Sequence, residues 1–126
     1  MAMRILFRAL MLASAVAMPM PLAAHGPAKG HNGGLRVDAG IYHTELLVDG
    51  TTTVAVFLSD VDDKPIAAAG FKATAILVVG GKPVQVDLGP VGTSKLAGTA
   101  PSPVKPGVKG VVRLTAPDGS TSQGKF

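Results

Sequence analysis

Apolar residues recur in short stretches along the chain, and glycine, proline or aspartate usually separates one stretch from the next. Between Val84 and Leu88 every second residue is apolar and the intervening ones are polar, the period-two pattern of a strand with one buried face. After the first two dozen residues no stretch shows the 3.6-residue periodicity of an amphipathic helix. The pattern predicts strands over 35–38, 41–48, 51–59, 71–79, 82–88, 94–99, 110–116 and 120–126.

Three of the breaks between these stretches have the composition of hairpin turns. Asp49-Gly50 and Gly80-Gly81 tolerate positive φ and suit two-residue turns, and Pro117-Asp118-Gly119 suits a slightly longer one. The proline-rich segment 101–106 cannot join a central ladder, because proline has no N–H to donate. Seven or eight short antiparallel strands predict an all-β fold, a small immunoglobulin-like β-sandwich rather than a closed barrel.

The N-terminal segment has a different pattern, that of a cleavable secretory signal. Two arginines give it a cationic start, an apolar run extends from Ala9 to about Met18, and small residues follow. The run is shorter than the ~20 residues that span a bilayer. Cleavage fits after Ala17 or after Ala24, and we favour Ala24 because it lies nearer the change to polar sequence.

These patterns divide the chain into three parts. Residues 1–24 are the expected signal peptide, residues 25–34 a flexible arm rich in glycine and histidine, and residues 35–126 one β-sandwich domain. The signal predicts export, and we expect the mature protein in the periplasm.

Composition narrows the classes of function. Twelve Lys and Arg against eight Asp and Glu give a formal net charge of +4, but Arg4 and Arg8 belong to the expected signal. The remaining charge is spread along the chain and forms no basic stripe for nucleic acid. The absence of cysteine excludes disulfides and thiolate sites, and four Phe, one Tyr and no Trp leave little material for stacking platforms.

All three histidines, His25, His31 and His43, lie near the start of the expected mature chain. Glu45 follows His43 by two residues, so the two side chains project from the same face of a strand. The glycine-rich arm can bring His31 or His25 back onto that strand. Imidazole and carboxylate ligands suit Zn(II) or Cu(II), and cleavage after Ala24 would give His25 a free α-amine that favours Cu(II).

The same residues also have a plainer interpretation. His43 and Glu45 can be ordinary residues on a solvated strand face, whereas the metal hypothesis adds Asp38 as a further oxygen ligand. The acidic segment from Asp60 to Pro65 lacks the ligand spacing of an EF-hand and predicts a tight polar turn. The sequence contains no nucleophile elbow and no recognisable pair of catalytic carboxylates, so it does not favour an enzyme.

The run from His31 to Leu46 resembles small periplasmic proteins linked to heavy-metal resistance, and a segment in the adaptor subunits of heavy-metal efflux systems. Their pattern is a histidine, two glycines, a short strand and then Tyr-His-x-Glu-Leu, and here Asn32 is an extra residue between the histidine and the glycines. The resemblance implies a role in handling metal outside the cytoplasm. It carries over chiefly to His43 and Glu45, and then to His31.

The sequence therefore supports two hypotheses. In the first, the chain is a periplasmic metal-binding protein that buffers or delivers Cu(II) or Zn(II), with His43 and Glu45 as rigid ligands and His31 or His25 closing the site. Its protein partner would be a heavy-metal efflux component. In the second, the chain is an accessory or interaction module of a cell-envelope complex and binds no metal.

Overall fold

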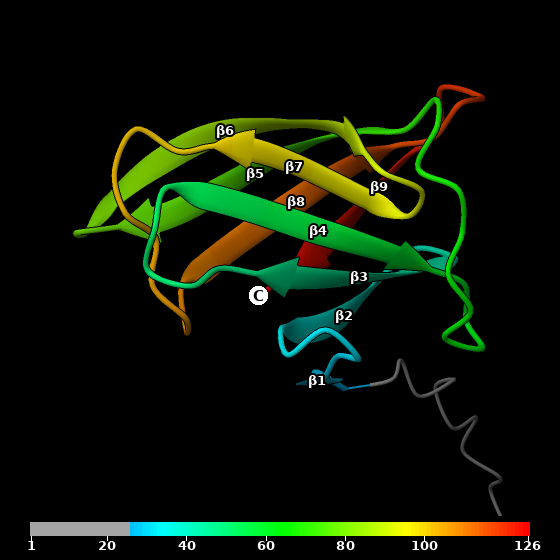
Figure 1. Ribbon diagram of the computed structural model, residues 1–126, viewed down its shortest axis with the longest axis horizontal. Coiled ribbons are helices and arrows are strands. Elements are labelled where there is room, and N and C mark those ends of the chain that lie inside the picture. Colours follow the sequence, from blue (N-terminus) through cyan, green and yellow to red (C-terminus); the bar gives the residue numbers. More distant parts are fainter. Residues whose placement is uncertain (1–25) are drawn as a thin grey trace, which may run out of the picture.

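The computed structural model describes residues 26–126 (Figure 1). The expected signal, residues 1–24, and His25 lie outside this range, so the cleavage site stays a prediction. Within residues 26–126 every regular element is a strand, and every pairing is antiparallel. This confirms the predicted all-β fold. In this part of the chain no helix is long and apolar enough to cross a membrane.

Nine strands form one curled sheet with the order β1-β2-β3-β4-β7-β6-β5-β8-β9. The count exceeds the predicted seven or eight because a two-residue strand, β1, forms within the expected arm. The bounds are β1 Ala28–Lys29, β2 Leu35–Ala39, β3 Tyr42–Leu47, β4 Thr53–Ser59, β5 Lys72–Val79, β6 Lys82–Val91, β7 Lys95–Thr99, β8 Lys109–Thr115 and β9 Thr121–Lys125.

The sheet curls into two packed layers, which gives the molecule a sandwich-like shape. In Figure 1, β3, β4 and β7 pass in front of β5, β8 and β9. Strand β6 joins the layers, because its first part pairs with β5 and its last residues, Gly89 to Val91, pair with β7. On the other side β9 approaches β2: a Cβ added at Gly124 would lie 2.9 Å from the side chain of Val37. Glycine therefore allows the two layers to meet there.

The hydrophobic core fills the space between the layers. Alternate residues of β5, which are Ala73, Ala75 and Leu77, are buried, as the period-two pattern predicts. Each buried Val or Leu contributes roughly 1.5 to 3 kcal/mol relative to an exposed one. Among residues 26–126, the valine and leucine side chains that are at most 1% exposed are Val54, Val56, Leu58, Leu77, Leu96, Val104, Val112 and Leu114.

Two of the three hairpins form as predicted. At Gly80-Gly81, Val79 pairs directly with Lys82, and φ values of 59° and 77° at the glycines are the positive values of a type I′ turn. The β8–β9 hairpin around Pro117-Asp118-Gly119 is also confirmed.

The hairpin at Asp49-Gly50 forms with a longer connection than the predicted two-residue turn. The last register pair joins Leu47 to Ala55. The Asp49 carboxylate accepts hydrogen bonds from the N–H and the hydroxyl of Thr51, at 3.1 and 2.6 Å. The Gly50 N–H donates to the Val104 carbonyl at 2.8 Å, so the turn is tied to the loop between β7 and β8. These competing contacts hold the chain in the wider turn.

The structure differs from the flexible arm predicted over residues 25–34. Ala28 and Lys29 form β1 and pair with β2. The following residues, 30–34, form a tight turn in which the Gly30 N–H donates to the Gly34 carbonyl at 2.9 Å. We call residues 30–34 the glycine turn. It packs onto β3 through a buried carboxylate.

Candidate functional site

The two residues that carried the metal hypothesis, His43 and Glu45, lie on the outer face of β3. Thr44 and Leu46 point into the core, so the alternation of a strand places His43 and Glu45 together on the opposite face, as predicted. This face is not solvated at either residue, because His43 is 2% exposed and Glu45 is 6% exposed. Two loops cover them.

The glycine turn covers Glu45. The Asn32 N–H donates to both carboxylate oxygens of Glu45 at 3.2 and 3.0 Å, and the Asn32 side-chain amide donates to Oε1 at 3.1 Å. The Gly34 N–H donates to Oε2 at 2.8 Å. The buried carboxylate is thus satisfied by donors of one turn, which is the usual condition for burying such a group.

The small residues of the glycine turn are required by this contact. A Cβ added at Gly30 would lie 2.0 Å from the Glu45 carboxyl carbon, and one at Gly34 would lie 2.3 Å from the Leu46 carbonyl oxygen. Both distances are far below van der Waals contact, so backbone and carboxylate can meet only at glycine. Gly34 and Glu45, which belong to the sequence pattern, therefore pack closely together with Gly30, which does not.

His43 is held between two carboxylates. Its Nδ1 lies 2.7 Å from Oδ1 of Asp63, and its Nε2 lies 3.1 Å from Oδ1 of Asp38, the neighbour of His43 in the β2–β3 register. An ionised carboxylate only accepts hydrogen bonds, and a neutral imidazole has a single N–H. An imidazolium, which carries an N–H on both nitrogens, satisfies both contacts.

Asp63 belongs to the acidic turn, which we define as residues 60–64. The turn is tight, as predicted, because Oδ1 of Asp60 accepts the N–H groups of Asp62 and Lys64 at 2.9 and 3.0 Å. Asp63 itself has a φ of 60°. The turn thus aims the Asp63 carboxylate back at the sheet.

Arg36 on β2 completes this network. Its guanidinium lies 2.5 Å from Oδ2 of Asp63, on the carboxylate whose other oxygen faces His43. The hydrogen bond to His43, together with the Arg36 guanidinium, holds the pKa of the Asp63 carboxyl below its ordinary value. The acidic turn is therefore fixed to the outer face by charged contacts.

Between the two loops the outer face carries a groove of about 510 Å³, which we call the outer-face groove. Phe57 and Pro65 give it apolar surface, and hydroxyls, the His31 side chain and the Arg36–Asp63 pair give it polar surface. The Lys95 ammonium lies 5.8 Å from the centre of the Phe57 ring. The lining residues are His31, Asn32, Arg36, Glu45, Phe57, Leu58, Ser59, Asp63, Pro65, Thr93 and Ser94.

Within residues 26–126 the structure does not bring the expected metal ligands His31, His43 and Glu45 together as a ligand set. His43 and Glu45 share a face, but each contacts protein groups, and the arm residue that reaches Glu45 is Asn32, whereas His31 is exposed in the outer-face groove. His25 lies outside the described residues. Among residues 26–126 no group of three or more His, Asp or Glu side chains is arranged to hold a metal ion. These residues therefore do not form a ready ligand set for Zn(II) or Cu(II).

Sequence reasoning missed the residues that cover the site. Asn32 entered the sequence comparison only as an inserted residue, yet it donates three of the hydrogen bonds to Glu45. Asp63 lies twenty residues from His43, and nothing local in the sequence places the two together. The available signal was the density of acidic residues in the 60–65 segment.

Comparisons with known proteins add no assignment. No protein family, no curated protein and no solved structure matches this chain.

Proposed function

We propose that this chain is an exported accessory module that docks a protein partner of the cell envelope through the outer-face groove. One observation carries the proposal: His43 and Glu45 hold the acidic turn and the glycine turn in place. These two loops form the walls of an open groove. The chemistry of the sequence pattern thus serves to build a binding surface.

The groove has the mixed character of a protein-binding surface. The Phe57 ring offers an aromatic surface with the Lys95 ammonium over it. Hydroxyl and backbone groups around it come from Ser59, Thr93 and Ser94. A volume of about 510 Å³ admits a few side chains of a partner segment. Its walls are pre-organised by charged hydrogen bonds, which lowers the entropy cost of binding.

The sequence resemblance indicates which partner to test. Because the run from His31 to Leu46 resembles a segment of heavy-metal efflux adaptors, the adaptor subunit of such a system in the same cell is the natural candidate. The expected signal supports a meeting of the two proteins outside the cytoplasm.

Binding to the purified adaptor subunit by biolayer interferometry tests the proposal. Thr93→Arg places a long side chain in the groove and should weaken binding at least tenfold. Thr121→Arg makes the same change at an exposed position of β9 and should leave binding unchanged. Equal affinities for the two variants, or no binding by the parent chain, would rule out the groove as the docking site for this partner.

A metal-binding role is the second candidate, and one observation favours it. Nε2 of His43 and Oδ1 of Asp38 lie 3.1 Å apart, so one imidazole and one carboxylate already converge. A Zn(II) or Cu(II) ion there would replace the shared proton, and His31 or His25 would have to supply further ligands. The Arg36 guanidinium nearby opposes a second cation.

Calorimetric titration of the untagged protein with Zn(II) and Cu(II) separates the two candidates. The metal role predicts affinity in the micromolar range or tighter that is lost in both His43→Gln and His31→Ala. The docking role predicts that the parent chain binds its partner without added metal and in the presence of a chelator. Heat that survives both substitutions would place any metal elsewhere in the chain.

A further inference from the structure

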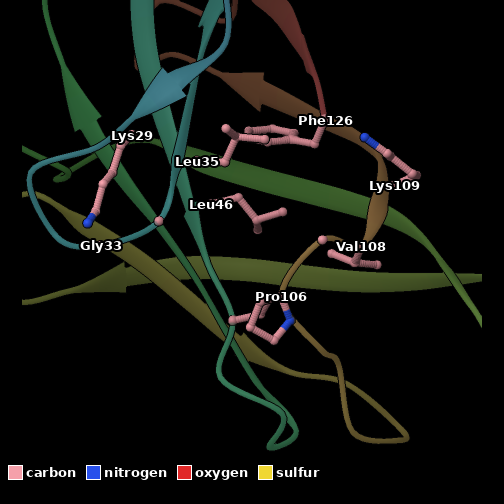
Figure 2. Close-up of a pocket in the computed structure, with 11 residues that line it drawn as sticks. Lys29, Gly33, Leu35, Leu46, Pro106, Val108, Lys109 and Phe126 are labelled. Atoms are coloured by element: carbon pink, nitrogen blue, oxygen red, sulfur yellow. The ribbon is translucent and has the colours of Figure 1, made fainter.

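A second cavity, of about 400 Å³, opens at the end of the sandwich between the glycine turn and the start of β8 (Figure 2). It lies apart from the outer-face groove, because its lining residues are different ones. The apolar side chains of its lining are those of Leu35, Leu46, Val48, Pro106, Val108 and Phe126.

The floor of the cavity lies against the hydrophobic core. Leu46, Val48 and Phe126 are at most 9% exposed and belong to the core cluster, whereas Leu35 is 37% exposed at the mouth. The apolar surface of the cavity thus extends from Leu35 at the mouth to buried core side chains at the floor. A ligand with a hydrocarbon chain would bury that chain here and gain from its removal from water.

Both walls of the cavity are fixed by backbone hydrogen bonds. Phe126 and Gly110 exchange two N–H to carbonyl bonds, at 3.3 and 2.9 Å, which hold the Phe126 ring against the cavity. Gly110 is required there, because a Cβ on it would lie 2.1 Å from the Ile76 carbonyl oxygen. The opposite wall is the glycine turn, which Glu45 holds. The site is therefore largely pre-formed.

The charge around the cavity has one sign. Lys29 and Lys109 are the ionisable residues among those that line it, and Figure 2 shows them on opposite sides of the apolar side chains. Two ammonium groups at the edge of an apolar cavity complement a ligand with one apolar chain and one anionic head.

We propose that this cavity binds a medium-chain fatty acid, with the hydrocarbon chain against Leu46 and Phe126 and the carboxylate at one of the two rim lysines, Lys29 or Lys109. The size favours a single chain, since a volume of about 400 Å³ is near the lower end of the roughly 300 to 1,000 Å³ typical of small-molecule sites. No covalent step is involved.

Titration with decanoate, followed by two-dimensional NMR of the backbone amides, tests the proposal. Saturable shifts should centre on Leu35, Val108, Lys109 and Phe126. The double variant Lys29→Ala/Lys109→Ala should weaken decanoate binding about two- to fivefold, the size expected for one exposed charge contact. Decanol should bind the parent and the double variant equally, because it has no anionic head.

Two further variants make the result decisive. Leu35→Glu places a carboxylate at the mouth without disturbing the core, because Leu35 is partly exposed, and it should abolish saturable decanoate binding. Lys72→Ala/Lys82→Ala removes two exposed lysines of the β5–β6 hairpin and should leave the affinity unchanged. Absence of saturable shifts in the parent chain, or equal loss in both lysine pairs, would overturn the proposal.

Discussion

Replacement of Glu45 by alanine is the sharpest test of how the outer face is built. The carboxylate receives hydrogen bonds from the Asn32 N–H, the Asn32 side chain and the Gly34 N–H. Hydrogen bonds to charged groups contribute about 1.5 to 3 kcal/mol each when buried. Asn32 is exposed and Gly34 is partly exposed, so water replaces part of what is lost. We therefore expect the free energy of unfolding to fall by about 2 to 3 kcal/mol.

Urea denaturation measures this change, with the m-value checked for constancy. Hydrogen exchange reports the local effect. The Gly34 amide should lose its protection from exchange in Glu45→Ala, while the protection of the β5 amides should decrease only by the change in global stability. Asp87→Ala is the matched control, since this exposed carboxylate has one long contact, 3.4 Å, to Thr74 and should cost less than about 0.5 kcal/mol. A cost for Glu45→Ala as small as that of the control, with Gly34 still protected, would refute the reasoning.

Three further predictions concern other contacts. Asp63 has a lowered pKa in the folded chain, so its carboxylate adds stability above the ordinary Asp pKa, and this stability is lost as the pH falls through the lowered value. The free energies of unfolding in urea of the parent and Asp63→Asn should therefore converge at acidic pH. A difference between them that does not change with pH would contradict the assignment. His43→Leu should destabilise the fold by about 1 to 3 kcal/mol, because it removes the contacts of the imidazole with the Asp38 and Asp63 carboxylates, and Asp63→Asn should recover part of that loss in a double-mutant cycle. Gly124→Ala should cost about 1 to 3 kcal/mol in thermal unfolding through its contacts with Thr44 and Val37, while Gly89→Ala, with open space around it, should cost less than 1 kcal/mol.

The fold class could be predicted because its signals are local. The alternation from Val84 to Leu88 and the Gly80-Gly81 turn each specify their structure within a few residues. The Asp49-Gly50 connection was mispredicted because its geometry depends on Val104, half the chain away. Strand order also depends on contacts between distant parts of the chain, since β4 pairs with β7 although β5 and β6 lie between them in the sequence.

The candidate site was predictable only up to the strand that carries it. That His43 and Glu45 share a face follows from period two alone. Apart from Asp38 on β2, their partners come from loops, and loop packing is set by tertiary contacts such as the close approach of Gly30 to Glu45. A histidine beside a carboxylate suggests metal chemistry in a sequence, but the same pair serves equally well to bury and satisfy charge once Asp63 and Asn32 arrive.

The glycine turn links the two proposed sites. One side of it, with His31 and Asn32, lines the outer-face groove, and the other side, with Gly33 and Gly34, lines the apolar cavity. Glu45 is the side chain that fixes this turn, through both Asn32 and Gly34. A ligand that shifts the turn in one site therefore alters the shape of the other, and the two binding free energies must be coupled reciprocally. The β1–β2 pairing fixes the two ends of the turn, and Glu45 is the side chain that contacts it between them, so any such coupling acts through Glu45.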